Sequence, residues 1–259
     1  MPKQQKIYFA SDIHLGMSPP EDSLKRERLF IEWLEEVRQD AREIWLLGDV
    51  FDYWFEYRKV VPRGFVRFQA KLAELQEAGI DIHLFTGNHD VWMFDYLPST
   101  LGVQVHHGLL EQEWNGKHFL LGHGDGLLRR ERSYRMLQRM FRNPFLQWCY
   151  ARIHPNASIA FAQRWSRNSR NKKGAFLPYL GKEKEYQVLF AREQISSSPK
   201  INYFVFGHRH IPYDIRITDT SRVICLGDWI HNFSYAVFDG KDLQLKRYLP
   251  DRGHIIIEE

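Results

Sequence analysis

Cysteine is scarce in this chain of 259 residues, and long apolar runs are missing. The two cysteines, Cys149 and Cys225, lie far apart and in no metal-binding spacing, so the sequence predicts two reduced thiols and no disulfide framework. No apolar run approaches the roughly 18 residues of a membrane-spanning helix. The residues after Met1 form no apolar signal segment, so we expect a cytoplasmic protein, attached at most to a membrane surface.

Apolar and aromatic residues, by contrast, are plentiful. Apolar residues make up 44% of the chain, which is enough for the core of one large domain or two small ones. The aromatic share of 15% is generous and favours apolar surfaces in addition to the core.

Strand and helix patterns alternate over the first half of the chain. Apolar residues recur at helical spacing in 24–37 and in 65–78, where Gly79 ends the pattern. Short apolar runs predict strands at 7–10, 44–47, 80–85, 103–106, 119–121, 201–206, 223–226, 235–238 and 243–246, with a weaker candidate at 255–257. This alternation predicts an α/β protein in which helices cover a sheet.

The segment 127–195 differs from the rest of the chain. Strand patterns stop there, and helical spacing dominates, broken at Pro144, Pro155 and Pro178. The segment contains 15 Lys or Arg and 4 Asp or Glu, a net charge of +11, which leaves −7 for the remainder of the +4 chain. We therefore expect a basic helical insert at 127–195 within an α/β core formed by 1–126 and 196–259.

Five short polar blocks follow one another along the chain, each at or just after a predicted strand. They are Asp12-Ile13-His14, Gly48-Asp49, Gly87-Asn88-His89-Asp90, His123-Gly124-Asp125 and Gly207-His208-Arg209-His210. Because the carboxyl ends of strands in an open α/β sheet line the ligand crevice, these side chains should meet in one place. A single block is weak evidence, since Gly-Asp after a strand is usually only a turn, but five in order are not expected by chance.

The side chains in these blocks are those of a metal site. Three carboxylate or amide oxygens and four imidazoles are too many ligands for one ion and suit two, with one carboxylate bridging them. Mixed nitrogen and oxygen ligands favour Mn²⁺, Fe or Zn²⁺ over Mg²⁺ or Ca²⁺. Two such ions activate water and neutralise phosphoryl charge, so the pattern predicts a hydrolase of phosphoesters or phosphoanhydrides.

The ordered blocks resemble those of the calcineurin-like metallophosphoesterases. The resemblance covers the chain outside the insert and implies a four-layer αββα sandwich with a binuclear site. It implies that one metal takes Asp12, His14 and His210, that the other takes Asn88, His123 and His208, and that Asp49 bridges them. It also implies that His89, oriented by Asp90, protonates a leaving alkoxide.

Shorter matches resemble the group of this superfamily that cleaves UDP-2,3-diacylglucosamine in lipid A biosynthesis. They are the Gly48–Trp54 block, an Asn168-Ser169 pair in an Arg-rich helix, Leu226-Gly227-Asp228-Trp229, and a helical insert before the last histidine block. The resemblance implies two Mn²⁺ ions as cofactor. It also implies a lipid-linked nucleotide sugar as substrate, and UMP and 2,3-diacylglucosamine 1-phosphate as products.

In this interpretation the insert is a lid that serves both ends of the substrate. Its large apolar residues would line an acyl groove: Phe141, Phe145, Leu146, Trp148, Ile153, Ile159, Phe161 and Trp165. Polar contacts to substrate are expected from Asn88, His89, Glu131, Arg167, Ser169, Arg170, Lys172, Lys173 and His208. A basic amphipathic surface also favours an anionic membrane, on the cytoplasmic face of the inner membrane. An ordinary helical subdomain with a solvated basic face is the alternative.

His89 departs from the lipid A group, which typically has Arg at this position. A histidine here favours a soluble nucleotide or phosphodiester hydrolase, because a leaving alkoxide needs a proton more than a leaving phosphate does. A binding protein without activity is a further alternative, which seven intact ligands disfavour. The apolar residues of the basic helices argue against nucleic acid as the partner.

Overall fold

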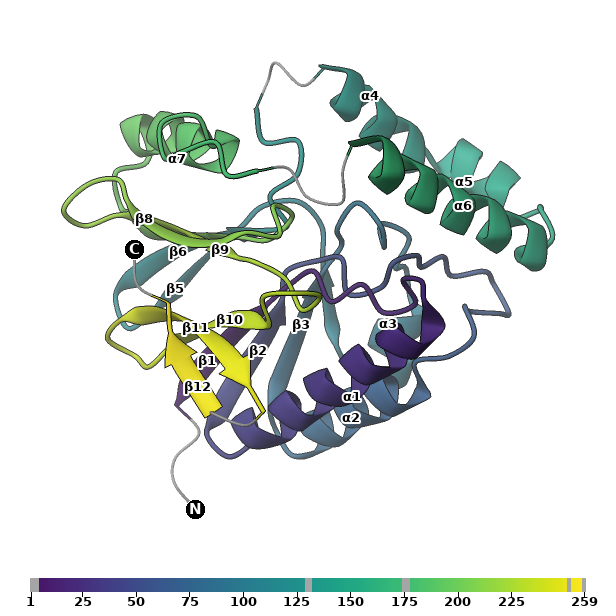
Figure 1. Cartoon of the computed structure of the whole chain (residues 1–259), viewed down its shortest axis with the longest axis horizontal. Helices are drawn as coiled ribbons and strands as arrows, with labels where there is room; N and C mark the ends of the chain where they lie inside the picture. Colours follow the sequence, from purple (N-terminus) through teal and green to yellow (C-terminus); the bar gives the residue numbers. More distant parts are fainter. Residues whose placement is uncertain (1–4, 129–131, 174–177, 251–252, 258–259) are drawn as a thin grey trace.

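Two β-sheets packed face to face form the centre of the molecule (Figure 1). This computed structural model describes residues 5–128, 132–173, 178–250 and 253–257; within those ranges, the side chains of 132, 133, 135 and 169–173 lie outside the description. The two sheets run through the first half and the last quarter of the chain, and helices cover their outer faces.

The larger sheet has seven strands in the order β12-β11-β10-β1-β2-β3-β4. In chain order these are β1 (Lys6–Ala10), β2 (Ala41–Leu46), β3 (Asp81–Phe85), β4 (Gln104–His106), β10 (Ser234–Phe238), β11 (Leu243–Leu249) and β12 (Gly253–Ile256). Strands β1 to β4 are parallel, so their carboxyl ends lie at one edge, and β10 to β12 are added antiparallel.

The smaller sheet has five strands in the order β5-β6-β7-β9-β8. They are β5 (Leu110–Trp114), β6 (Lys117–Gly122), β7 (Ile201–Phe206), β8 (Pro212–Arg216) and β9 (Arg222–Leu226). The central strands β6, β7 and β9 are parallel, whereas the edge strands β5 and β8 are antiparallel to their neighbours.

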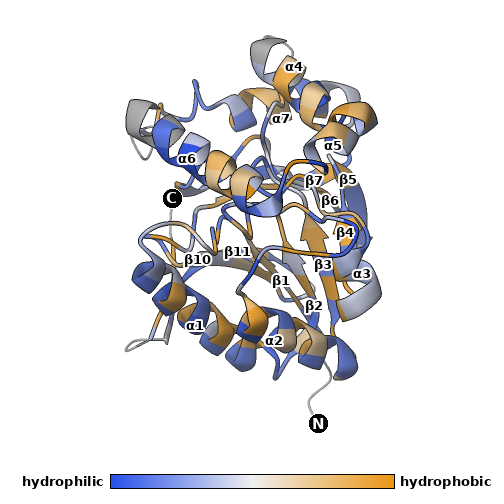
Figure 2. Ribbon diagram, turned by 90° about the vertical axis from the view of Figure 1, so that its right-hand side faces the viewer, coloured by the Kyte–Doolittle hydropathy of each residue, from blue (hydrophilic) through white to orange (hydrophobic). Residues whose placement is uncertain are grey.

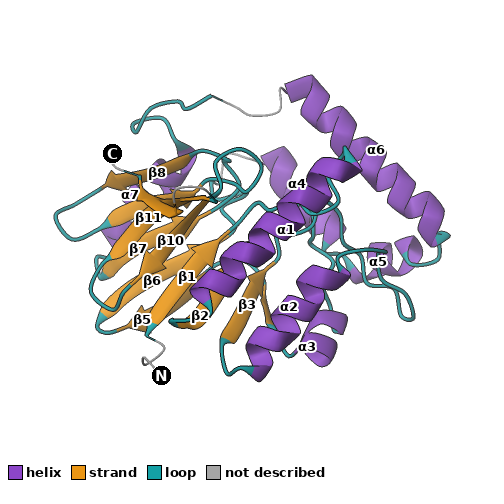
Figure 3. Ribbon diagram, turned by 60° about the horizontal axis from the view of Figure 1, so that its bottom comes forward, coloured by secondary structure: helices purple, strands orange, loops and turns teal. Residues whose placement is uncertain are grey.

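Helices complete four layers. The outer face of the larger sheet is covered by α1 (Pro20–Val37), α2 (Val66–Glu77) and α3 (Tyr96–Leu101), as Figure 3 shows. The outer face of the smaller sheet is covered by α7 (Tyr186–Ser197), which contacts β7 and β9. The predicted four-layer α/β fold is therefore confirmed.

The two-residue period of the strands separates the layers of the core. In β1, Ile7 and Phe9 face the smaller sheet, whereas Tyr8 and Ala10 face α1 and α2. In β7, Tyr203 and Val205 face the larger sheet, whereas Phe204 and Phe206 pack under α7. Both faces of these central strands are buried, which explains their nearly continuous apolar sequences.

Three helices stand outside the four layers: α4 (Arg132–Phe141), α5 (Pro144–Tyr150) and α6 (Pro155–Lys173) (Figure 1). Aromatic residues of the core attach them. The Trp92 indole N–H donates to the Phe141 carbonyl at 2.9 Å, and the hydroxyls of Tyr53 and Tyr150 lie 3.1 Å apart. The Trp92 and Tyr150 rings also stack, with centroids 5.3 Å apart. The segment 127–195, predicted as an insert, contains these three helices and most of α7, which packs on the sandwich. The predicted boundaries between core and insert, at 126 and 196, stay a prediction.

Two edge strands, β5 and β8, and the short helix α3 were not predicted. The edge strands read Leu-Glu-Gln-Glu-Trp and Pro-Tyr-Asp-Ile-Arg, and their charged residues hide the apolar alternation. Charge and proline are common on edge strands because one side of such a strand is solvated. Among the residues that the structure describes, no helix is both long and apolar enough to cross a membrane.

A buried histidine, His83, which contacts the half-buried His106 at the edge of the larger sheet, predicts a pH-dependent stability. His83 stacks on Trp45 with ring centroids 3.7 Å apart, and its Nδ1 lies 3.0 Å from Nε2 of His106. Burial and the nearby His106 lower the pKa of His83 from 6.5 to about 4. The folded protein therefore resists protonating His83, whereas the unfolded chain protonates it near pH 6.5.

We expect the free energy of unfolding to be unaffected by His83 above pH 6.5 and to fall as the pH drops toward 4. The loss should be on the order of 2 kcal/mol. Urea unfolding at pH 7 and pH 5 would measure it for the wild type and for His83→Gln, which has no proton to gain. Equal losses in the two proteins would contradict the prediction, and His118→Gln is a half-exposed control.

Candidate active site

The five polar blocks lie on loops at the carboxyl ends of parallel strands from both sheets. Asp12, Asp49 and Asn88 follow β1, β2 and β3, while His123 follows β6 and the His208–His210 turn follows β7. The two sheets present these ends to the same side of the sandwich, beneath α4 to α6 (Figure 1). Fold topology thus gathers residues that are up to about 200 positions apart.

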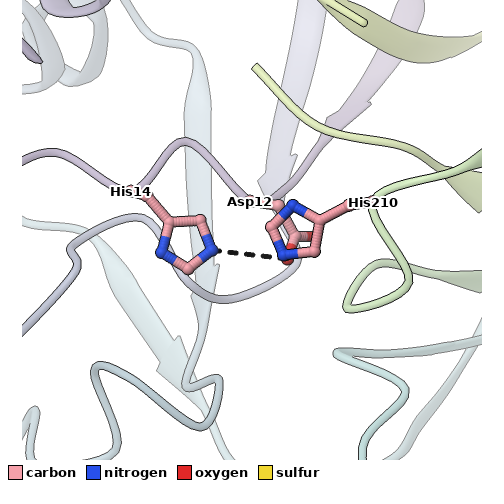
Figure 4. A group of neighbouring side chains, drawn as sticks. All are labelled: Asp12, His14 and His210. Carbon is pink, nitrogen blue, oxygen red and sulfur yellow. Dashed lines mark ion pairs between the residues drawn. The ribbon is translucent and has the colours of Figure 1, made fainter. Parts of the chain in front are cut away.

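One group of ligand atoms comes from Asp12, His14 and His210 (Figure 4). The carboxylate Oδ1 of Asp12 lies 3.8 Å from Nε2 of His14 and 3.3 Å from Nε2 of His210. The two imidazole rings are stacked with centroids 5.1 Å apart. All three groups converge on one point, as the ligands of a single ion would.

A second group comes from Asp49, Asn88, His123 and His208. Nε2 of His123 lies 3.4 Å from Asp49 Oδ2, 3.1 Å from Asn88 Oδ1 and 3.2 Å from His208 Nδ1. The same Asp49 oxygen is 3.6 Å from Nε2 of His14 in the first group. The structure therefore brings all seven predicted ligands together, with Asp49 between the two groups.

The polar atoms of this cluster suit divalent cations. Asp12 Oδ1 and His14 Nε2 are buried and have no hydrogen-bond partner in the described part of the chain, although both face the other ligands. Burial alone would raise the pKa of Asp12, but the imidazoles of His210 and His14 lower it to about 2. Burial alone would lower the pKa of His14, but Asp12 and Asp52 raise it to about 10. Buried carboxylates that stay ionised are stabilised by nearby positive charge, so this cluster fits a site for divalent metal ions.

The backbone at the ligands is unusual. Asp12, His14, Asp49, His208 and His210 have φ between 49° and 68°, the left-handed region. In the described residues only three other non-glycine residues share this conformation: Phe65, Asn115 and Phe233. Such strain costs about 1–3 kcal/mol per residue and concentrates at functional sites, so the surrounding fold holds these ligands in place.

Glycines let the ligand loops approach one another. A Cβ on Gly87 would lie 2.2 Å from Asp49 Oδ1 and 2.5 Å from the Asp49 nitrogen, and a Cβ on Gly207 would lie 2.5 Å from Asp12 Oδ2. Either atom would collide with a predicted ligand. The Gly that precedes Asn88 and the Gly that precedes His208 are therefore required by the packing of neighbouring loops.

Carboxylates behind the cluster orient its imidazoles. Asp52 Oδ1 lies 3.2 Å from Nδ1 of His14, and Asp228 Oδ2 lies 3.3 Å from Nδ1 of His210. The other ring nitrogen of each histidine then points to the metal position. Both aspartates lie within motifs, Gly48–Trp54 and Leu226–Trp229, but nothing in the sequence pattern indicated this role.

We expect Asp228→Asn to weaken metal binding about 10- to 100-fold, because the amide no longer offers His210 a negative partner. The other carboxylate oxygen, Oδ1, accepts hydrogen bonds from the backbone N–H of residues 230, 231 and 232, and asparagine keeps that acceptor. The fold should therefore be retained. Calorimetric titration of the metal-free protein with Mn²⁺ measures the effect; an unchanged affinity would contradict it, and Asp219→Asn is a control.

Asp90 lies behind the site and does not hold His89. Its carboxylate accepts hydrogen bonds from the backbone N–H of Asp49, Val50, Phe51 and Gly87 at 2.8–3.2 Å. It thus joins the loops after β2 and β3. The orientation of His89 by Asp90, which the family resemblance implied, is not what the structure shows.

His89 is instead held by Asp52 and by the insert. Its Nδ1 lies 3.1 Å from the Asp52 carbonyl oxygen and 3.4 Å from the hydroxyl of Ser166 on α6. His89 is half-buried at the wall of the site, 4.8 Å from His14 between ring centroids. Ser166, three residues before the predicted Ser169, was missed because only the fold places α6 over this loop.

The remaining predicted substrate contacts are not located. Glu131 lies outside the described residues. Arg167 is an exposed residue of α6. The last turns of α6 contain Ser169, Arg170, Lys172 and Lys173, whose side chains lie outside the description. Of the predicted contacts, Asn88, His89 and His208 therefore lie within the cluster.

The sequence of this chain is similar to those of known hydrolases. The family model of calcineurin-like phosphoesterases matches residues 5–212. A UDP-2,3-diacylglucosamine hydrolase of Porphyromonas gingivalis is 44% identical over 255 residues, which cover 94% of this chain and 97% of the relative. One of Tolumonas auensis with the same name is 26% identical and covers 92% and 94%. A dimetal phosphatase structure from Danio rerio is 15% identical, with a TM-score of 0.48, and covers 99% of this chain and 98% of that chain. The chain belongs to the calcineurin-like phosphoesterase family.

Proposed function

We propose that this protein hydrolyses the pyrophosphate bond of UDP-2,3-diacylglucosamine. The products are UMP and 2,3-diacylglucosamine 1-phosphate, and the reaction belongs to lipid A biosynthesis. The similarity to hydrolases of that name over nearly the whole chain supports the substrate. The observation in the structure that carries the proposal is the apolar insert, which lies over the cluster of predicted metal ligands.

The insert exposes many large apolar side chains. Phe145, Phe161 and Trp165 are 68%, 59% and 55% exposed, and α5 has no buried residue. Figure 2 shows the apolar stretches along α4, α5 and α6. A patch of this kind on a soluble protein marks a binding surface for an apolar partner. Two acyl chains next to a diphosphate are such a partner, and the contact of Ser166 with His89 joins this surface to the site.

The chain's own residues fit the cleavage of an anhydride. The two ions would be held by Asp12, His14, Asp49, Asn88, His123, His208 and His210. When bound, they neutralise phosphoryl charge and activate water. His89 lies at the wall of the cluster, beside the position that the phosphoryl group of a bound substrate would take. Its Nδ1 faces the Asp52 carbonyl, so Nδ1 carries a proton and Nε2 is left for the substrate. A phosphate monoester leaves as a stable anion, so the reaction needs no strong acid at this position.

Four further features belong to the proposal. The native ions are Mn²⁺, which suits the mixed nitrogen and oxygen ligands. Residues 127–195 act as a lid. This lid contacts the substrate through Glu131, Arg167, Ser169, Arg170, Lys172 and Lys173. The basic, apolar surface of the lid also docks on the anionic cytoplasmic face of the inner membrane, where a diacylated substrate resides.

Release of UMP from detergent-dispersed UDP-2,3-diacylglucosamine tests the proposal. With Mn²⁺ we expect turnover that a chelator abolishes and that Mn²⁺ restores. No UMP at micromolar enzyme would refute the substrate assignment.

A soluble phosphodiester hydrolase is the second candidate, and the position of His89 favours it. The histidine lies among the candidate metal ligands, grouped with His14 and Asp49, where it can reach a leaving oxygen. Fast hydrolysis of bis(p-nitrophenyl) phosphate without turnover of the lipid substrate would select this candidate. We expect the reverse preference.

A further inference from the structure

A recess opens from the cluster of predicted metal ligands beside the first turns of α1. It is a cavity of about 630 Å³ between the first turns of α1 and the loop 229–233. Its inner end is formed by His14, His89 and His210. Figure 3 shows the first turns of α1 at the same end of the sandwich as the insert. The cavity is in the range of small-molecule sites, which is about 300–1,000 Å³.

The wall of the cavity combines an apolar floor with a polar rim. Met17, Leu29 and Phe233 supply apolar surface, and Leu29 and Phe233 pack against the core behind them. The rim carries Asp22 and Lys25, whose carboxylate and ammonium groups lie 3.4 Å apart with side chains 59% and 78% exposed. Floor and rim together suit a flat, uncharged group with polar edges.

His89 separates this cavity from the insert. Ser166 of α6 contacts His89 from the insert, while the ring of His89 also lines the cavity. A diphosphate held at the metals therefore has two exits, one toward exposed aromatic side chains and one into the cavity. Only the first is bordered by the large apolar surface of α4 to α6.

We propose that the cavity between α1 and the loop 229–233 binds the nucleoside half of the substrate; this rests on the proposed function. The pyrimidine lies on the floor made by Leu29 and Phe233. Asp22 accepts from the ribose hydroxyls, which is the usual role of a carboxylate in nucleotide sites. Lys25 donates to a pyrimidine carbonyl. The phosphate of UMP remains at the metals, near His89 and His210.

An acyl chain is the competing occupant of the cavity. A chain of methylene groups gains from the apolar floor but makes no use of a carboxylate and an ammonium at the rim. If both acyl chains of the substrate lay there, the exposed aromatic residues of the insert would have no partner on the substrate. A nucleoside uses both parts of the cavity, so we assign the cavity to the nucleoside.

Filling the cavity tests the assignment. Calorimetry on the Mn²⁺-loaded protein would compare the affinity for UMP with that for ribose 5-phosphate, which lacks the base. We expect the wild type to bind UMP at least tenfold more tightly. Leu29→Trp should bring the ratio close to one, and Met17→Trp, which fills the cavity from a loop, should do the same. Leu24→Trp is the matched control, since Leu24 is an exposed residue of the same helix that does not line the cavity.

The outcomes separate the proposal from the function on which it rests. If the wild type shows no preference for UMP, or if both filling variants fold and keep it, the nucleoside lies elsewhere. If they keep the preference but raise the KM for UDP-2,3-diacylglucosamine, the cavity holds an acyl chain and the assignment is overturned. If the wild type releases no UMP from the lipid substrate, the proposed function fails, whatever the ratio of affinities.

Discussion

Asp49→Asn is expected to lower kcat/KM at least about a thousandfold, a loss of roughly 4 kcal/mol in transition-state stabilisation. Asp49 lies between the two ligand groups, 3.4 Å from His123 and 3.6 Å from His14, and is buried. An amide has no negative charge to share between two divalent ions. We therefore expect the purified variant to hold one metal ion per chain or fewer, where the wild type holds two.

The isosteric change isolates charge from structure. The introduced asparagine would keep an oxygen for the His89 backbone N–H, which donates to Asp49 Oδ1 at 2.8 Å. The folded structure should survive, as circular dichroism would show. Elemental analysis gives the metal content, and UMP release gives the rate. Asp81→Asn, an exposed carboxylate at the start of β3, is the control. If Asp49→Asn held two ions per chain and kept a near-normal rate, the prediction that Asp49 bridges the two ions would be wrong.

Gly87→Ala is expected to lower the rate by about 100-fold or more through a single methyl group. The added Cβ would lie 2.2 Å from Asp49 Oδ1, far inside van der Waals contact, so Asp49 or the loop after β3 must shift. A displacement of about 1 Å at the reacting groups is enough to cost about 100-fold in rate. Because the site is buried and close-packed, we also expect a loss of about 1–3 kcal/mol in the free energy of unfolding.

Gly122→Ala is the matched control for this prediction. Neither Gly87 nor Gly122 has the positive φ that only glycine adopts easily, so both variants test space rather than backbone strain. At Gly122 the nearest atom is the end of the flexible Leu109 side chain, at 2.7 Å, which can move aside. Thermal unfolding and UMP release measured on both variants would decide. An active Gly87→Ala protein would show that the loops have room to adjust.

The ligands were predictable because each follows a strand. Strand ends in an α/β sheet share one edge, so order along the chain was enough to bring Asp12, Asp49 and Asn88 together. The alternation of helical and strand periods predicted helices that cover a sheet, and the resemblance to the metallophosphoesterases implied the four layers. None of this required a distance between side chains.

The supporting residues were not predictable, because their roles depend on contacts between loops. Asp228 reaches His210 from a different strand, and Ser166 reaches His89 from a helix 77 positions away. For Asp90, the adjacent His89 suggested a side-chain pair. In the structure, the Asp90 carboxylate instead accepts hydrogen bonds from four backbone N–H groups. Sequence adjacency indicates which residues share a loop, but not which way each side chain faces.

The left-handed backbone at five ligands implies a trade-off between stability and activity. Glycine adopts φ near +50° to +70° without the steric cost that an imidazole residue bears. His14→Gly or His210→Gly should therefore relieve backbone strain in the metal-free protein, each by about 1 kcal/mol, while deleting a ligand. The backbone conformation at these positions therefore costs stability, whereas the imidazoles that it positions serve metal binding.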